Sequence, residues 1–174
     1  MMLGRGLAVA AATAVLDQIT KALVLGFFGE PGCALHRVPV SRFLDLVLTC
    51  NPGVSFGLFN QLGQTGETRA NSLIFSLVAL LIVIVLAFWL RRVRATFLAV
   101  AIGLIIGGAI GNVIDRLRFG AVIDFLDFHL ASWHWPAFNL ADSAICLGVG
   151  AMLLDSMLSR RPAPQAKRRE DISP

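Results

Sequence analysis

The sequence predicts a mainly α-helical membrane protein, with four transmembrane helices, a small extracytoplasmic β-sheet and surface loops. Hydrophobic residues make up 56% of the 174 residues, above the roughly 45–50% that is usual for soluble domains. Four apolar segments are long enough to cross a bilayer core, which needs about 20 residues per helix. We expect these helices at residues 6–28, 72–90, 95–114 and 137–158, within one domain covering residues 1–160.

The first apolar segment has two interpretations. A cleavable signal peptide is one, because Arg5 precedes the apolar run. Charged residues interrupt this run, however, and it then resumes as far as Phe28. Asp17 and Lys21 stand four residues apart, which places them on one helical face. We therefore expect a retained helix whose ion pair either offsets its own cost of insertion or supports a site inside the bundle.

Residues 29–70 are polar and interrupted by glycine and proline, so we expect them outside the bilayer. Arg42–Leu48 has the composition of a strand, and the following sequence Asn51-Pro-Gly53 is a turn signal. A second strand running into Phe59 would complete a small sheet on the membrane surface. From its spacing alone, Asn51 is best interpreted as a turn residue.

The second and third apolar segments carry clear boundary signals. Ser72–Leu90 contains no charge and ends in an aromatic residue followed by arginines, a pattern typical of a membrane boundary. In the third segment, Gly103, Gly107 and Gly111 recur every four residues and leave one helical face without side chains. Close approach of another helix is a sufficient explanation for these glycines.

Polar residues follow at the end of the third segment. Asn112, Asp115 and Arg116 are three or four residues apart, so they share one side of the helix. Residues 121–128 then fit a strand or an interfacial segment, with Asp124 among apolar neighbours. The next aromatic residues form a belt of the kind found at membrane interfaces: Trp133, Trp135 and Phe138.

The fourth helix has a favourable start at Pro136. Asn139 and Asp142 then fall in its first turns, where the helix dipole and free N–H groups favour an anion. Beyond this helix the chain is rich in proline and charge. We expect residues 161–174 to form a disordered, basic cytoplasmic tail.

The basic residues are divided unevenly between the two ends of the predicted helices. Nine of the fifteen, including Arg5, the arginines after Leu90 and those of the tail, fall on one side. The positive-inside rule places that side, and both termini, in the cytoplasm. The polar loops and the aspartates of the third loop then face the extracytoplasmic side.

Asp124 and Asp142 are the candidate catalytic residues. Both have apolar neighbours, and neither has a basic partner close in sequence, unlike Asp17 and Asp115. Two carboxyl groups that face each other do not both ionise readily, so one can act as general acid while the other activates a water. Their separation of 18 residues does not establish contact. Without further information, a solvated loop residue and an anion at a helix N-terminus are the simpler explanation.

No other catalytic set or cofactor site stands out in the sequence. His129 and His134 lack a third residue placed as a metal ligand. The three cysteines have no CxxC spacing and give neither a metal signature nor a disulfide framework. We therefore expect no metal or organic cofactor. The net charge of +4 is explained by topology, so we expect no nucleic-acid partner.

Five motifs occur in order and with suitable spacing. They are Asp17-Gln-Ile-Thr-Lys21, Asn51-Pro-Gly-Val-Ser-Phe-Gly57, Gly107-Gly-Ala-Ile-Gly-Asn-Val-Ile-Asp-Arg116, Val122-Ile-Asp-Phe125 and Phe138-Asn-Leu-Ala-Asp-Ser143. As a set they resemble the motifs of the lipoprotein signal peptidase (signal peptidase II) family of bacterial inner-membrane aspartic proteases. The resemblance covers about residues 5–158, and it is specific as a set although each motif alone would be weak.

The resemblance implies both an activity and a set of roles. The family cleaves diacylglyceryl-modified prolipoproteins just before the lipidated cysteine, and globomycin blocks it. We accordingly expect a monomer surrounded by membrane lipid, with a lipid-modified prolipoprotein as substrate. Asp124 and Asp142 would form the catalytic pair. The residues that would line or support the substrate pocket are Asn51, Gly53, Asn112, Arg116 and Asn139, and those that would hold the architecture are Asp17, Lys21 and Asp115.

Two other classes of function stay open on the residues alone. A proton-coupled transporter would use Asp17, Lys21, Asp115 and Arg116 as its proton relay. A non-catalytic membrane scaffold would be indifferent to changes at Asp124 and Asp142.

Overall fold

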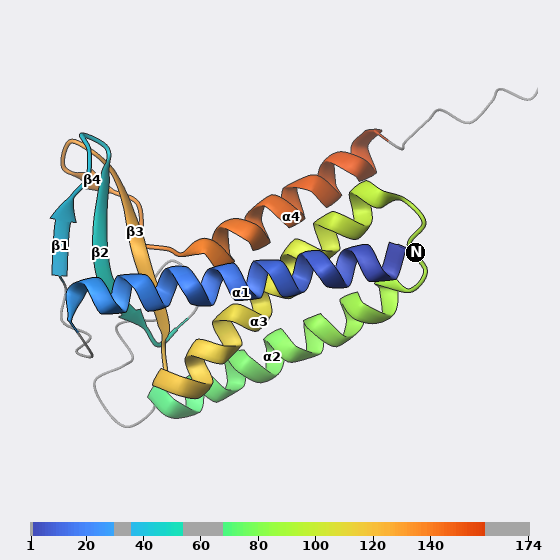
Figure 1. The fold of residues 1–174 in the computed structure, drawn as a ribbon, viewed down its shortest axis with the longest axis horizontal. Coiled ribbons are helices and arrows are strands. Elements are labelled where there is room, and N and C mark those ends of the chain that lie inside the picture. The colour runs from blue at the N-terminus through green and yellow to red at the C-terminus, as the bar shows by residue number, and fades with distance from the viewer. Residues whose placement is uncertain (1, 30–35, 54–67, 159–174) are drawn as a thin grey trace, which may run out of the picture.

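The computed structural model describes residues 2–29, 36–53 and 68–158. Four long helices form a bundle, and a sheet lies at one end of it (Figure 1). All four helices are long and apolar enough to cross a membrane, so the predicted fold class is confirmed. The elements are α1 (Met2–Phe28), β1 (His36–Pro39), β2 (Leu44–Asn51), α2 (Thr68–Leu90), α3 (Thr96–Phe119), β3 (Val122–Leu130), β4 (Trp133–His134) and α4 (Leu140–Leu158).

The central helix is α3, and α1 packs against its glycine face. The buried residues of α1 recur every three or four positions and therefore form a single stripe along that helix. A Cβ atom added to Gly107 would lie 2.5 Å from the backbone oxygen of Ala10, so no side chain fits between the two backbones. The glycine spacing of α3 thus serves the close helix approach that it predicts.

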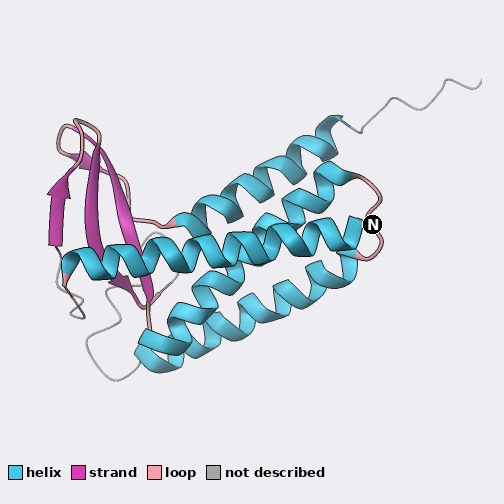
Figure 2. Cartoon of the chain, viewed as in Figure 1, coloured by secondary structure: helices cyan, strands magenta, loops and turns pink. Residues whose placement is uncertain are grey.

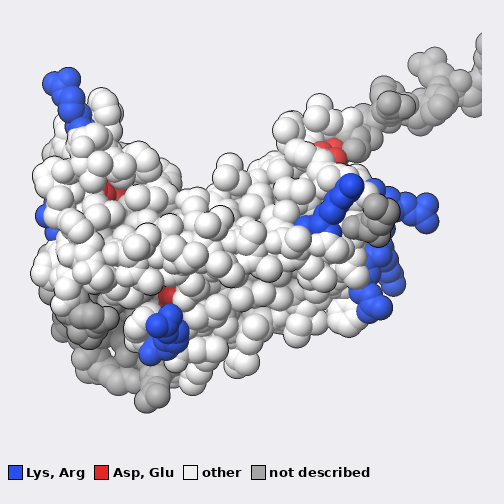
Figure 3. Space-filling model, viewed as in Figure 1, with Lys and Arg blue, Asp and Glu red and all other residues white. Residues whose placement is uncertain are grey.

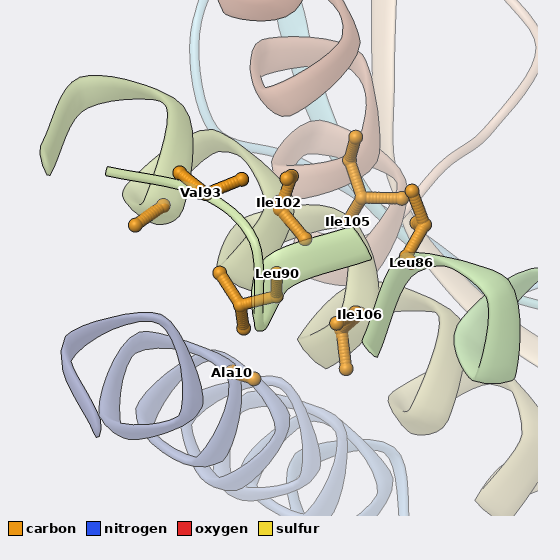
Figure 4. Packing of buried hydrophobic residues seen from close by; sticks show 8 residues of the cluster. Ala10, Leu86, Leu90, Val93, Ile102, Ile105 and Ile106 are labelled. Carbon is orange, nitrogen blue, oxygen red and sulfur yellow. The ribbon is translucent and has the colours of Figure 1, made fainter. Parts of the chain in front are cut away.

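Two apolar clusters hold the elements together. One joins α1, α2 and α3, with Leu90 and Ile102 fully buried (Figure 4). The other lies between the end of α1 and the sheet, and it fixes the sheet against the bundle. Its buried members are Val24, Leu48, Ile123 and Phe125.

The sheet is antiparallel, with the strand order β1-β2-β3-β4 (Figure 2). Strands predicted around Arg42–Leu48 and residues 121–128 are confirmed as β2 and β3. The two outer strands are additional to the prediction, because both are short and exposed and carry little apolar pattern. The predicted second strand towards Phe59 lies outside the described residues.

Four helix boundaries differ from the predicted ones. α1 and α2 each begin four residues before the predicted starts at residues 6 and 72, at Met2 and Thr68. α3 continues past Ile114 to Phe119, since its polar residues find partners inside the protein and the helix does not need to end before them. It stops at Gly120, whose φ of 76° is the left-handed conformation that favours glycine at a helix end. α4 begins at Leu140, four residues after Pro136, the start predicted from the sequence. The predicted tail, residues 161–174, lies outside the described residues.

The cysteines correct one expectation. Cys50 is disulfide-bonded, and its partner lies outside the described residues, whereas the cysteine pattern predicts no disulfide framework. That prediction is wrong because a single bridge needs only two cysteines close in space, and spacing along the chain does not reveal this. Cys146, exposed on α4, is a free thiol.

Ion pairs of Arg37 and polar contacts of two histidines join all four strands of the sheet. Arg37 on β1 lies 2.8 Å from Asp127 on β3 and 3.3 Å from Asp45 on β2. Two histidines complete the network: His134 on β4 lies 3.0 Å from the carboxylate of Asp127, and His129 lies 3.1 Å from that of Asp45. Both carboxylates are buried, so the stability of the sheet depends on the positive charge of Arg37 to balance their negative charges.

We expect Arg37→Ala to destabilise the protein by about 1–3 kcal/mol, because it leaves buried carboxylates without their shared cation. Thermal unfolding of the purified protein in detergent measures this loss. The matched control is Arg42→Ala, since Arg42 is exposed in the neighbouring turn and has no ion pair among the described residues. Equal losses in the two variants would contradict the role given to Arg37.

Candidate active site

The predicted site residues meet where the sheet joins the bundle. They come from α1, α3, the end of β2, β3 and the start of α4, so segments distant in sequence build one site. Arg116 is half-buried and all the others are buried. These residues are Asp17, Lys21, Asn51, Gly53, Asn112, Asp115, Arg116, Asp124, Asn139 and Asp142.

The deepest part of the site is a lysine held between two carboxylates. Lys21 Nζ lies 2.8 Å from Asp17 Oδ2 and 2.7 Å from Asp115 Oδ2, and all three side chains are at most 2% exposed. A buried charge that loses its partner costs about 3–5 kcal/mol, so each member of this triad depends on the other two. Of the two interpretations of the Asp17–Lys21 pair, the geometry favours support of a site inside the bundle.

Each carboxylate of the triad also accepts a hydrogen bond from a backbone N–H group of the site. Asp17 Oδ1 accepts a hydrogen bond from the Ala141 N–H at 2.9 Å, in the first turn of α4. Asp115 Oδ2 accepts one from the Ile123 N–H at 3.1 Å, near the start of β3. Asp17 reaches its position because Gly111 of α3 has no side chain there. The two elements that carry the candidate catalytic pair are therefore attached to one ion triad.

Asn139 caps α4 and brings its start alongside β3. Its Oδ1 accepts the Asp142 N–H at 2.9 Å, which is the bond expected of an N-cap residue. Phe138 exchanges backbone hydrogen bonds of 3.0 and 2.9 Å with Leu126. Asp142 thus lies in the first turn of α4, as predicted. The backbone pairing between Phe138 and Leu126 places this turn next to β3, the strand that contains Asp124.

Side-chain amides connect the two aspartates. Asn139 Nδ2 donates to Asp124 Oδ1 at 2.7 Å, and Asn112 Nδ2 donates to Asp142 Oδ1 at 2.9 Å. Asn139 Nδ2 also lies 3.2 Å from Asn112 Oδ1, so hydrogen bonds run from one carboxyl group to the other. The second oxygen of Asp124 accepts from Asn51 Nδ2 at 3.2 Å.

Lys21 sets the direction of this chain of amides. Its Nζ donates to Asn112 Oδ1 at 3.1 Å, and an ammonium group can only donate. The amide oxygen of Asn112 therefore faces Lys21, which leaves its NH₂ group facing Asp142. A residue on α1 thus fixes a hydrogen bond to a carboxyl group on α4.

The pKa of Asp124 is raised from 3.8 to about 7, chiefly by burial. The carboxylate of Asp142 contributes to this rise, whereas the hydrogen bonds from Asn51 and Asn139 oppose it. The two carboxyl groups therefore interact electrostatically, as a pair that shares one proton must. This interaction contradicts the simpler explanation of a solvated loop residue, since Asp124 is 1% exposed.

Arg116 holds the turn that follows β2. Its Nη2 donates to the Gly53 oxygen at 2.9 Å, and the Gly53 N–H donates to Asn51 Oδ1 at 3.0 Å. The second bond is the local turn expected of Asn51. Because the amide nitrogen of the same side chain reaches Asp124, Asn51 is both a turn residue and a site residue.

Gln18 is a site residue that the sequence analysis missed. Its Nε2 donates to Asp115 Oδ1 at 2.9 Å and to the Gly111 oxygen at 3.2 Å, so it extends the triad along α3. The available signal was a polar side chain inside a predicted membrane span, next to an ion pair. Among the described residues, no group of His, Cys, Asp or Glu could hold a metal ion.

The chain resembles known membrane enzymes over most of its length. Residues 9–158 match the family model described as Signal peptidase (SPase) II. The chain belongs to this family. Lipoprotein signal peptidases from Methylorubrum extorquens (strain PA1) and Azoarcus sp. (strain BH72) are each 44% identical to it, over 92% of this chain and 88% and 86% of their own lengths.

The fold is similar to that of a solved bacterial membrane enzyme. That structure, determined by the in meso method at 2.3 Å resolution, is 27% identical to this chain, with a TM-score of 0.74. The similarity covers 94% of this chain and 95% of that one. The resemblance drawn from the five motifs is therefore confirmed, and membership of a peptidase family favours the enzyme over the transporter and the scaffold.

We predict that Asp124→Asn changes how stability depends on pH. Since the folded-state pKa of Asp124 is about 7 against 3.8, its ionisation opposes folding, and the native protein loses stability as pH rises from about 4 to above 7. The amide does not ionise. The difference in Tm between variant and native protein should therefore be more positive at about pH 8.5 than at about pH 5. An equal difference in Tm at the two pH values would contradict the raised pKa of Asp124.

Proposed function

We propose that this protein is a membrane aspartic endopeptidase that removes the signal peptide from diacylglyceryl-modified prolipoproteins, cleaving before the lipidated cysteine. The observation that carries the proposal is the chain of hydrogen-bonded amides that joins two buried carboxyl groups, Asp124 and Asp142, at the end of a bundle of helices long enough to span a membrane. The similar proteins from Methylorubrum extorquens and Azoarcus are named lipoprotein signal peptidases, which supports the same substrate class here.

Asp124 and Asp142 take different roles in this proposal. Asp124 carries the shared proton, because burial raises its pKa. Asp142 lies at the positive end of α4 and acts as the base that takes a proton from water. The water oxygen attacks the scissile carbonyl carbon while Asp124 protonates the carbonyl oxygen. The resulting diol collapses: Asp142 gives the proton it took from water to the peptide nitrogen, a diol hydroxyl returns a proton to Asp124, and the C–N bond breaks, so one water is consumed.

The remaining site residues position this pair. The three asparagines orient the carboxyl groups without charge, Arg116 and Gly53 shape the substrate side, and the ion triad of Asp17, Lys21 and Asp115 holds the elements together. One chain supplies every one of these groups, so a monomer is sufficient. The pair activates water by itself, and the reaction requires no cofactor.

A cavity between α2, α3 and α4 could receive the signal helix of the substrate. Its volume is about 220 Å³, and it extends from the polar residues Asn112 and Arg116 to the apolar residues Ile82 and Ile105. An apolar helix lying there would meet mainly apolar side chains. Its polar end is one hydrogen bond from Asp142, where the scissile bond must arrive.

We place the site on the extracytoplasmic side of a bacterial inner membrane, with both termini in the cytoplasm. Lys and Arg side chains gather at the end of the bundle near the N-terminus, away from the sheet (Figure 3), as the positive-inside rule expects of a cytoplasmic end. The disulfide bond of Cys50 adds support, because disulfides persist in oxidising compartments. The exposed apolar side chains of the helices suit contact with membrane lipid.

Asp124→Asn and Asp142→Asn should each lower prolipoprotein cleavage by about 10²- to 10⁴-fold, because each removes one proton-transfer group. The measurement is cleavage of a purified lipid-modified precursor in detergent. In the native enzyme, kcat/KM should also fall above about pH 7, where Asp124 loses its proton. Asp155→Asn, near the other end of α4, is the matched control and should retain activity. Full activity in either variant of this pair, the aspartate dyad, would refute the proposal.

Reporter fusions test the proposed topology. A reporter fused at Ala131, between β3 and β4, should give an extracytoplasmic signal, whereas one at Arg92, between α2 and α3, should give a cytoplasmic signal. A cytoplasmic signal at Ala131 would invert the arrangement and place the dyad on the wrong side for exported substrates.

A further inference from the structure

A cavity of about 740 Å³ lies beside the dyad, where β2 ends, α2 begins and α3 passes into β3. Its walls combine basic and apolar side chains, and none of the described residues that line it is acidic. The residues that matter for its chemistry are Ser72, Leu73, Arg116, Leu117, Arg118 and Phe119.

Two hydrogen-bond donors on the wall of this cavity have no partner. The hydroxyl of Ser72 and the Nε of Arg116 are buried and make no hydrogen bond within the described chain. Buried polar groups are almost always paired in native proteins, so each exception requires an explanation. Ser76, one turn further along α2, shows the ordinary solution: it is equally buried and donates to the Ser72 backbone oxygen at 2.8 Å.

The unpartnered donors are connected to the dyad. Arg116 donates to the Gly53 oxygen, the Gly53 N–H donates to Asn51, and Asn51 donates to Asp124. Arg116 therefore lies three hydrogen bonds from the proposed general acid. This position suits a part of the substrate that is covalently close to the scissile bond but does not react.

The chemistry of the wall points to acceptor oxygens attached to hydrocarbon. Arg116 can only donate, and Ser72 has an O–H to donate, while Leu73, Leu117 and Phe119 offer apolar surface. A glycerol ester has carbonyl oxygens that only accept, and each continues into an acyl chain. A peptide backbone would also bring N–H donors, which the guanidinium of Arg116 cannot accept.

We propose that this cavity binds the glycerol ester carbonyl groups of the lipidated cysteine, with Ser72 and Arg116 as donors. The inference rests on the proposed function, because it takes the diacylglyceryl group next to the scissile bond as the ligand. It adds Ser72, which lies outside all five sequence motifs, as a residue that determines specificity for lipid-modified substrates.

A change in the substrate tests this assignment without changing the protein. A precursor whose cysteine carries a dialkyl ether of glycerol lacks the two carbonyl oxygens and keeps the hydrocarbon chains. The native enzyme should cleave this precursor with a kcat/KM about three- to tenfold lower for each hydrogen bond lost. Equal kcat/KM for the ester and ether precursors would overturn the proposal.

Ser72→Ala tests the residue. The variant should lower the preference for the ester over the ether by about three- to tenfold, and its Tm should equal or exceed that of the native protein because an unpaired buried hydroxyl is removed. The matched control is Ser76→Ala, whose lost hydroxyl bonds to backbone, so its ester preference should stay native. An unchanged preference in Ser72→Ala would overturn the assignment.

Two further outcomes are distinguishable. Phosphatidylglycerol added to the micelles carries the same ester groups; if it inhibits the native enzyme and not Ser72→Ala, and no ester preference is seen, the cavity belongs to bilayer lipid and the substrate assignment is overturned. If the native enzyme cleaves neither precursor, the proposed function itself fails, which differs from cleavage of both without preference.

Discussion

The position of Lys21 between Asp17 and Asp115 is the interaction on which the rest of the structure depends. Charged groups inside a membrane protein are costly unless they are paired, and this pairing requires α1 and α3 to approach to backbone contact. The glycine face of α3 permits that approach. Once the triad is closed, its remaining oxygens bind the starts of α4 and β3, and its ammonium group orients Asn112. One buried ion therefore determines where both candidate catalytic groups lie.

Neutral amides donate hydrogen bonds to both aspartates: Asn51 and Asn139 to Asp124, and Asn112 to Asp142. A cation beside Asp124 would favour the ionised carboxylate and lower its pKa, which would remove the proton that a general acid needs. Asparagine holds the carboxyl oxygens without that effect. The charge of Lys21 is the weakest of the influences on the pKa of Asp124, because Asn112 and Asn139 lie between them. The site thus gains rigidity from an ion triad while its acid keeps a pKa near 7.

The sequence predicts the helices of this fold better than the contacts of its site. Apolar length is a local property, so four spans and the face of Asp17 and Lys21 could be predicted from residues alone. The meeting of Asp124 with α4 could not, because it depends on backbone pairing between Leu126 and Phe138. The motifs supplied the site residues only through family resemblance. Ser72 had no signal, since a serine in a helix usually bonds its own backbone.

The polar groups of the site differ in how completely they are hydrogen-bonded or ion-paired, and this difference indicates the side from which the substrate approaches. Behind the dyad, every charge of the ion triad has partners within 3 Å. In front of it, Asp124 has a raised pKa, and Ser72 and Arg116 keep donors unused. Folding gains stability when buried groups are paired, so unpaired groups that lie together on one side are best explained by a partner that folding does not supply. The substrate should therefore approach from the side of α2 and the end of β2, and the α1 side should remain closed throughout the reaction.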